Sequence, residues 1–198
     1  MSTVHEIGSG NPLSLFDTWL KEAGAHEPND PNAAALATST ADGQPSVRMV
    51  LVKRIAEDRF CFFTNAESHK GRQLAENPRA ALCFHWKSLR RQIRIEGTIA
   101  ELDSAKVDAY FHSRSRASQI GAAISYQSRP LASREALEEK ARFFAEAHPG
   151  DIPRPSYWRG YQLHPHQIEF WIDGPHRLHD RFLFTLDGNR WQRSRLYP

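Results

Sequence analysis

The stretch Ile168-Glu-Phe-Trp-Ile-Asp-Gly-Pro-His-Arg-Leu-His-Asp-Arg181 contains an apolar run, a turn and a cationic return segment. The run is aromatic enough for a strand, and Asp173-Gly174-Pro175 is strong turn chemistry. After the turn, Arg177, His179 and Arg181 occupy alternate positions, which in a strand project to one face. Such a cationic row suits a planar polyanion, because Arg offers a fork for phosphate and a flat face for stacking. The solvated face of an edge strand explains the row equally well, so the hairpin alone leaves both interpretations open.

Length and composition favour one α+β domain, which we expect over residues 11–198 after a short flexible arm over residues 1–10. The chain has 198 residues, of which 40% are hydrophobic and 25% charged, as in ordinary globular proteins. No apolar run approaches the roughly 20 residues of a membrane span, and the first residues lack the pattern of a secretion signal. We therefore expect a cytoplasmic protein without a membrane partner, in which Cys61 and Cys83 are reduced thiols.

The charge balance points to anion recognition rather than to nucleic acid. The net charge is +3, and the basic residues are 20 Arg and 6 Lys, a bias that favours fork-like recognition of phosphate or carboxylate. The sequence contains no run of five or six basic residues and no helix-turn-helix, zinc-finger or RNP pattern. We expect no nucleic-acid partner.

Hydrophobic periodicity predicts an ordered series of short elements. Helices are predicted over residues 12–24, 68–77, 104–112, 117–124 and 134–148. Strands are predicted over residues 33–40, 46–53, 59–65, 79–86, 92–102, 161–170, 177–186 and 191–196. Many short strands joined by tight turns, such as Asp42-Gly43, indicate a closed or nearly closed antiparallel barrel.

One helical spacing suggests a phosphate grip. Tyr110, Arg114 and Ser118 are spaced i, i+4 and i+8, so a continuous helix would place a phenol, a guanidinium and a hydroxyl on one face. In an alternative interpretation, the helix is interrupted between Ser113 and Arg116, and the three residues do not share a face. A solvated helix face also accounts for the spacing.

Two other basic pairs are candidates for anion contacts. Arg48 and Lys53 are five residues apart and have opposite strand parity unless a bulge intervenes. We therefore do not expect one phosphate to contact both, although two different phosphates could. Ser68-His69-Lys70 opens a helix, whose N-terminal N–H groups favour an anion. Ordinary surface charge explains each pair taken alone.

Motifs for other chemistries are missing. There is no dinucleotide fingerprint, Walker loop, HExxH motif or nucleophile elbow. The histidines of His164-Pro165-His166, and His176 with His179, have no nearby carboxylate cluster or cysteine partner in the sequence. We expect no metal site.

Several motifs, taken in order along the chain, resemble one family. They are Asn11-Pro12-Leu13-Ser14-Leu15-Phe16, Arg48-Met49-Val50-Leu51-Val52-Lys53, Phe63-Thr64-Asn65, Arg91-Gln92, Tyr110-Phe111-His112-Ser113-Arg114, Ser118-Gln119-Ile120-Gly121, Gln127-Ser128, Gln167-Ile168-Glu169-Phe170-Trp171 and Arg177-Leu178-His179-Asp180-Arg181. Together they resemble the pyridoxine/pyridoxamine 5'-phosphate oxidase family from about Asn11 to the C-terminus.

The resemblance implies a fold, an assembly and a reaction. The implied fold is an FMN-binding split β-barrel, antiparallel and Greek-key-like, with flanking helices. The implied assembly is a homodimer with its FMN sites at the subunit interface. The implied reaction oxidises pyridoxine or pyridoxamine 5'-phosphate to pyridoxal 5'-phosphate. A hydride passes from substrate C4' to flavin N5, and O2 accepts the electrons to give H2O2.

The same resemblance assigns residues to ligands. Those implied to contact FMN are Arg48, Met49, Val50, Leu51, Val52, Lys53, Phe63, Thr64, His69, Lys70, Gln92, Gln127, Ser128, Trp158 and Arg181. Those implied to bind substrate are Lys53, Tyr110, Arg114, Ser118, Arg177, Leu178 and His179. Arg177 and His179 are implied to be catalytic, with Arg177 over the open face of the substrate ring and His179 bonded to its 3-oxygen.

The chain departs from the family pattern at three positions, and two other classes of function stay open. His69 stands where the family often has Arg, Ala123 where an aromatic is common, and Ile172 is unusual at its position. One alternative is a flavin reductase or an oxidase for a different substrate on the same barrel, since fold does not fix function. Another is a non-catalytic module that binds flavin, pyridoxal phosphate or nucleic acid.

Overall fold

The computed structural model describes residues 7–8, 10–54 and 59–198, so most of the arm expected over residues 1–10 lies outside the described residues. The helices are α1 (Pro12–His26), α2 (His69–Glu76), α3 (Ser104–Ser113), α4 (Arg116–Ile124) and α5 (Arg134–Ala147). The strands are β1 (Ala33–Ser39), β2 (Pro45–Leu51), β3 (Phe60–Asn65), β4 (Arg79–Trp86), β5 (Arg91–Glu101), β6 (Trp158–Ile172), β7 (Asp180–Asp187) and β8 (Arg190–Leu196). A short 3-10 helix, η1 (Pro175–Arg177), precedes β7. The predicted order of helices and strands is confirmed, with most bounds shifted by one to three residues.

The antiparallel sheet branches at its longest strand, β6. The paired order is β2-β1-β4-β5-β6-β7-β8, and β3 also pairs with β6. β5 runs along one edge of β6, while the other edge pairs first with β3, over residues 158–163, and then with β7, over residues 167–172. β6 therefore carries two different neighbours, one at each end.

The barrel formed by this sheet is split rather than closed. Within the described residues, β3 pairs with the segment that follows β2 through one isolated β-bridge, between Lys53 and Cys61. A single bridge is no continuous ladder, so the sheet curls toward closure without reaching it. The split-barrel expectation is confirmed, and the fully closed alternative is wrong.

Helix α1 covers the core of the curled sheet. Asn11 caps it by accepting a hydrogen bond from the N–H of Leu13, and Pro12 occupies the first turn, where no N–H is needed. The apolar stripe of the helix buries Phe16, whose ring meets that of Phe60 edge-on at 4.8 Å, and Trp19. Full burial of such a side chain contributes about 1.5–3 kcal/mol.

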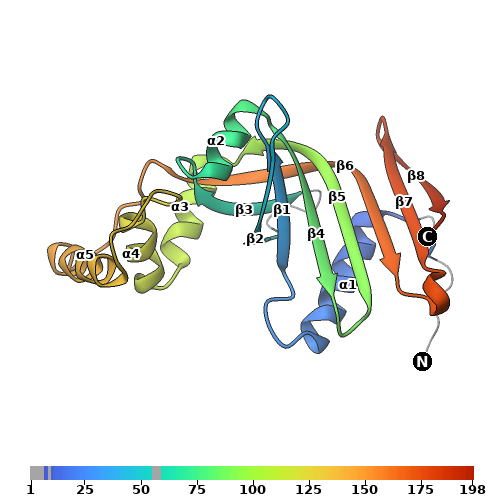
Figure 1. The fold of residues 1–198 in the computed structure, drawn as a ribbon, viewed down its shortest axis with the longest axis horizontal. Coiled ribbons are helices and arrows are strands. Elements are labelled where there is room, and N and C mark those ends of the chain that lie inside the picture. The colour runs from blue at the N-terminus through green and yellow to red at the C-terminus, as the bar shows by residue number, and fades with distance from the viewer. Residues whose placement is uncertain (1–6, 9, 55–58) are drawn as a thin grey trace.

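The remaining helices and the last hairpin occupy opposite ends of the molecule. Helices α3, α4 and α5 gather at one end of the long axis, whereas β7 and β8 lie at the other (Figure 1). A second apolar cluster holds the helical end together, and its buried members are Val107, Phe111, Ile152 and Trp158. No helix in the described part of the chain is long and apolar enough to cross a membrane.

The return segment after the C-terminal turn is not the strand that alternation predicts. Arg177 belongs to η1 rather than to a strand, and β7 begins only at Asp180. His176 and Arg177 have φ of 57° and 63°, in the left-handed region. Gly174 allows this tight reversal, because a Cβ there would lie 2.1 Å from the carbonyl oxygen of Leu178. The predicted common face for Arg177, His179 and Arg181 is therefore wrong.

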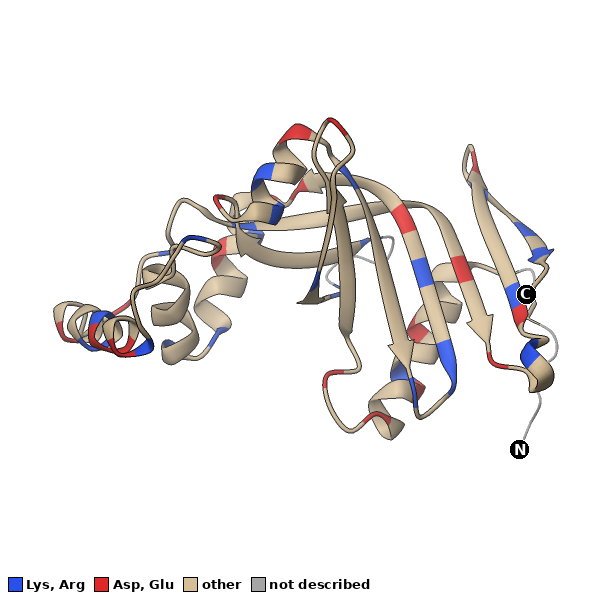
Figure 2. Ribbon diagram, viewed as in Figure 1, with Lys and Arg blue, Asp and Glu red and all other residues tan. Residues whose placement is uncertain are grey.

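Charges of both signs are interleaved across β5, β6 and β7 (Figure 2). Their centre is Glu169, which is only 5% exposed. Its carboxylate accepts a hydrogen bond from Nε of Arg181 at 2.7 Å and one from Nη1 of Arg94 at 3.2 Å. A buried carboxylate with two such partners fixes the direction of the Arg181 side chain.

Candidate functional site

A cavity of about 740 Å³ lies where β2, β3 and α2 meet the helical end of the molecule. Its lining residues are Arg48, Met49, Val50, Leu51, Phe63, Thr64, His69, Lys70, Tyr110, Arg114, Ser115, Ser118, Gln127, Ser128 and Trp158. None of these residues is an aspartate or a glutamate. The cationic side chains of Arg48, Lys70 and Arg114 thus line the cavity, and no carboxylate lies among its lining residues.

Lys70 is a buried cation with neutral partners. It follows Ser68, whose side chain caps α2, and its own side chain turns inward so that the residue is 8% exposed. Its Nζ donates to Oγ1 of Thr64 and Oε1 of Gln127, both at 2.9 Å. Burial, and secondarily the charge of Arg48, lowers the pKa of Lys70 to about 8. An anion in the cavity would supply the charge that these partners lack.

Arg48 is held by hydroxyl groups of the sheet. Its guanidinium donates to Oγ1 of Thr38 and Oγ of Ser46, both at 2.5 Å. Both hydroxyls in turn donate to Oε1 of Gln73 on α2, at 2.6 Å. Burial lowers the pKa of Arg48. The network therefore fixes the guanidinium without neutralising it.

Stacked aromatic rings form another wall of the cavity. The ring of Phe63 lies 4.0 Å from that of Tyr110 and 5.2 Å from that of Trp158, with interplanar angles of 21° and 11°. Such a parallel stack continues naturally against a flat ligand.

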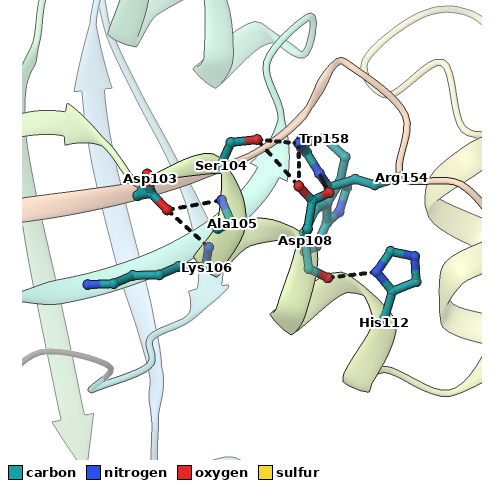
Figure 3. A network of polar contacts seen from close by, with 8 residues as sticks. All are labelled: Asp103, Ser104, Ala105, Lys106, Asp108, His112, Arg154 and Trp158. Atoms are coloured by element: carbon teal, nitrogen blue, oxygen red, sulfur yellow. Dashed lines mark hydrogen bonds and ion pairs between the residues drawn. The ribbon is translucent and has the colours of Figure 1, made fainter.

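Arg154 ties this wall to α3 (Figure 3). Its Nη1 donates to the carbonyl oxygen of Trp158 at 2.8 Å, and its Nε donates to Oδ1 of Asp108 at 2.6 Å. The hydrogen bond from Arg154 holds the pKa of the Asp108 carboxyl below its usual value. The start of β6 and the helix that carries Tyr110 are therefore locked together.

The three residues predicted to share a helix face come together, but not on one helix. α3 ends at Ser113, Arg114 has the extended values φ −76° and ψ 155°, and Ser115 caps α4. Tyr110, Arg114 and Ser118 nevertheless all line the cavity. The break between α3 and α4 therefore lies at the cavity, with lining residues on both sides of it.

Arg114 has a donor without a partner. Its guanidinium carbon lies 5.0 Å from the centre of the Trp158 ring, and burial lowers its pKa. Its Nη1 is the one buried side-chain nitrogen or oxygen in the described residues that has no hydrogen-bond partner. An unsatisfied buried donor costs about 1–3 kcal/mol, so this position favours an anionic acceptor.

The structure leaves part of the predicted site away from this cavity. Val52, Lys53 and Gln92 do not line it. Arg177, Leu178, His179 and Arg181 belong to the opposite end of the molecule, around η1 and β7 (Figure 1). The predicted residues therefore form two groups within one chain.

Three residues that sequence reasoning did not assign contribute to these groups. Ser115 lines the cavity, and its position as a helix cap after Arg114 was the available signal. Glu169 orients Arg181, and the ring of Trp171 lies 4.6 Å from that of His179. No local sequence pattern predicts either contact, because strand pairing creates them.

Comparison with known proteins assigns the chain to a family. Residues 20–145 match the family model described as "Pyridoxamine 5'-phosphate oxidase", and residues 158–198 match "Pyridoxine 5'-phosphate oxidase C-terminal dimerisation region". The chain belongs to the pyridoxamine 5'-phosphate oxidase family. The family resemblance seen in the sequence is thus confirmed, and the second match supports a homodimer.

Individual members of the family agree over almost the whole chain. The pyridoxine/pyridoxamine 5'-phosphate oxidase of Gluconobacter oxydans is 55% identical over 189 residues, covering 95% of this chain and 94% of the relative. That of Sphingopyxis alaskensis is 56% identical over 195 residues, covering 96% and 88%. PhzG from Burkholderia lata, solved with tetrahydrophenazine-1-carboxylic acid, has a TM-score of 0.92 at 33% identity, covering 100% and 98%. A protein from Nostoc punctiforme described as pyridoxamine 5'-phosphate oxidase-related and FMN-binding shares the fold, with a TM-score of 0.78 at 19% identity, covering 96% and 100%.

Membership of this family supports the FMN predicted from the sequence, and the cavity fits that cofactor. Arg48 and Lys70 are buried or half-buried cations without a carboxylate partner, as a phosphate group requires. The stack of Phe63, Tyr110 and Trp158 offers a flat apolar wall. Within the described residues no group of three or more His, Cys, Asp or Glu side chains gathers as a metal would need.

Proposed function

We propose that the protein oxidises pyridoxamine and pyridoxine 5'-phosphate to pyridoxal 5'-phosphate, with FMN as cofactor and O2 as acceptor. The observation that carries the proposal is the carboxylate-free cavity. Arg48 and Lys70 suit a flavin phosphate, and a third cation, Arg114, has an unpaired donor for another anion. A flavin and a phosphorylated substrate together need two anion sites. The identity of about 55% to enzymes of this name supports the same reaction.

A homodimer with FMN sites at its interface explains why the predicted site is divided within one chain. Arg177 and His179 lie at the far end of the sheet from the cavity, so in this proposal they serve the cavity of the other subunit. The rim of the cavity offers apolar surface for that contact. Met49 and Leu51 of β2 line the cavity and are 64% and 48% exposed. Burial of such side chains against a second copy stabilises a dimer.

In this arrangement the side chains bind and orient the substrate. Tyr110, Arg114 and Ser118 hold its phosphate, and Arg177 from across the interface covers the ring and orients the C4' group. FMN held by Arg48 and Lys70 would supply the redox chemistry, in which the two electrons lost at C4' reduce O2 to H2O2; for the amine substrate, water would complete the reaction and release ammonia. Cys61 and Cys83 are not joined in a disulfide, which agrees with the cytoplasmic location that we propose.

A visible absorption spectrum, followed by anaerobic addition of pyridoxamine 5'-phosphate, tests this function. We expect a flavin band that bleaches on addition and recovers when air is admitted. A flavin band that persists after addition would reject the proposed substrate while keeping the cofactor. The absence of a band after FMN is supplied would reject any flavin enzyme.

Oxidation of a different substrate is the second candidate, because PhzG, which is 33% identical, was solved with a tricyclic carboxylic acid. Tetrahydrophenazine-1-carboxylic acid carries no phosphate, so the grip of Tyr110, Arg114 and Ser118 separates the two candidates. If tetrahydrophenazine-1-carboxylic acid bleaches the flavin band and pyridoxamine 5'-phosphate does not, this second function is favoured.

Replacing Arg114 with glutamine tests the phosphate grip. We expect the KM for pyridoxamine 5'-phosphate to rise at least about 10-fold while kcat changes little, because a phosphate handle contributes mostly uniform binding. The unliganded variant should unfold at no lower temperature than the wild type, since a buried unpaired donor is removed. Arg142→Gln, on the exposed face of α5, is the control. A KM unchanged in Arg114→Gln would remove this residue from the substrate site.

A further inference from the structure

Gln73 is a buried amide on the same face of α2 as Lys70. The two residues are three positions apart, about one turn along the helix, and Gln73 is 2% exposed. Oγ1 of Thr38 and Oγ of Ser46 both donate to its Oε1 at 2.6 Å. These two hydroxyls come from residues that are paired across β1 and β2. Gln73 therefore joins α2 to two neighbouring strands through a single oxygen.

The amide of Gln73 has one orientation that satisfies its surroundings. Its Nε2 lies 3.4 Å from the carbonyl oxygen of Gln44, which can only accept a hydrogen bond. The amide nitrogen must therefore point to Gln44, and the amide oxygen to the hydroxyls of Thr38 and Ser46. Each hydroxyl has one proton, and each gives it to this oxygen. Both hydroxyls then present only lone pairs to any other neighbour.

The neighbour that uses those lone pairs is Arg48. Its Nη1 donates to Oγ1 of Thr38 and its Nη2 donates to Oγ of Ser46, both at 2.5 Å. Nη1 also donates to the carbonyl oxygen of Leu36 at 3.3 Å. None of these acceptors carries a negative charge, so the positive charge of the guanidinium is left for a ligand. A hydroxyl that turned its proton toward Arg48 would lose this contact, so the orientation that Gln73 sets holds the guanidinium.

We propose that Gln73 is a positioning residue, which orients two hydroxyl groups so that they hold the Arg48 guanidinium ready for the phosphate of FMN. This inference rests on the proposed function, in which Arg48 and Lys70 bind that phosphate. Both of these cations line the cavity, whereas Gln73 does not. A guanidinium that is held before the phosphate arrives loses less conformational freedom on binding. Helix α2 thus contributes to the site twice, directly through Lys70 and indirectly through Gln73.

Riboflavin provides a selective test, because it is the same flavin without the phosphate. Titration of the unliganded protein, followed by flavin fluorescence, gives a dissociation constant for FMN and one for riboflavin. Gln73→Met keeps much of the side-chain volume and removes the acceptor oxygen. In this variant FMN affinity should fall about 5- to 10-fold, while riboflavin affinity should change less than about 2-fold. Gln192→Met makes the same exchange at an exposed position of β8 and should change neither affinity.

Two further comparisons separate positioning from support of the fold. In an Arg48→Met background, Gln73→Met should weaken FMN binding no further, because Gln73 acts through Arg48. An equal loss in both backgrounds would show that Gln73 acts through α2 and Lys70, and would overturn the proposal. Thr38→Val keeps the shape and removes one of the two hydroxyls, so it should lower FMN affinity in the same selective way by a smaller factor. If Gln73→Met fails to fold, an unchanged preference for FMN over riboflavin in Thr38→Val would overturn the proposal.

The binding measurements do not depend on turnover. A wild-type protein that binds FMN but does not oxidise pyridoxamine 5'-phosphate would reject the proposed reaction and leave the role of Gln73 standing. Equal weakening of FMN and riboflavin in Gln73→Met, or an unchanged FMN affinity, would overturn that role. A wild-type protein that binds FMN no more tightly than riboflavin would reject the phosphate site, and the positioning role of Gln73 with it.

Discussion

Replacing Arg177 with alanine is expected to lower turnover roughly 100- to 1000-fold while FMN stays bound, the size of effect seen when a group that stabilises the transition state is removed. Arg177 is exposed and lies in η1, away from the cavity that Arg48 and Lys70 line. Its loss should therefore leave the cofactor contacts of that cavity unchanged. Single-turnover reduction of the flavin, measured anaerobically, reports this step without the reaction with O2.

Two further variants show whether the effect belongs to the guanidinium. Arg177→Lys keeps the charge and loses the planar fork, so we expect turnover to remain far below that of the wild type. Arg190→Ala removes an exposed arginine from β8 and should be neutral. Because residue 177 has a φ of 63°, unfolding temperatures of all three variants must be compared. Loss of FMN from Arg177→Ala would contradict the assignment to the substrate side.

Replacing Lys70 with methionine is expected to weaken FMN binding about 10- to 100-fold, because a hydrogen bond to a charged group contributes about 1.5–3 kcal/mol. Methionine keeps much of the volume of the buried side chain and removes its charge. The dissociation constant can be measured by titrating the unliganded protein with FMN and following flavin fluorescence. Lys106→Met, at an exposed position of α3, is the control. Unchanged FMN affinity in Lys70→Met would assign the phosphate to other residues.

The pKa of Lys70 also predicts how FMN affinity depends on pH. In the unliganded protein this pKa is lowered to about 8, whereas a bound phosphate favours the charged amine. Binding above pH 8 therefore takes up a proton, so affinity should be constant below pH 8 and decline as the pH rises above it. The decline should be weaker in Lys70→Met. An equal pH dependence in both proteins would assign the titration to another group.

The stability of the unliganded protein should change in the opposite direction over the same range. The folded protein releases the Lys70 proton near pH 8, while the unfolded chain retains it to the ordinary value near 10.5. Between these values the unfolded state binds more protons, so this group makes unfolding less favourable as the pH rises. The unfolding temperature of the wild type, relative to Lys70→Met, should therefore increase from pH 8 to pH 10.

The sequence by itself determined the local structure and the family. Helix α1 follows from the Asn11 cap, Pro12 and an apolar stripe, and β4 has the bounds that its apolar run predicts. The motifs that run from Asn11 to the C-terminus identified the family and its cofactor, and the match of family models confirms both. These features are readable because capping, periodicity and motif spacing depend on residues close together in the chain.

The tertiary structure decided how the site is assembled. Arg48, Lys70 and Arg114 come from β2, α2 and the break between α3 and α4, and they share a cavity because these segments pack together at one end of the sheet. Because β3 and β7 pair with different ends of β6, Arg177 and His179 lie at the other end of the molecule. Alternation predicted a strand there, but the close approach that Gly174 permits forms a left-handed turn instead. Strand pairing and close packing between distant segments set these positions, and no pattern of neighbouring residues records them.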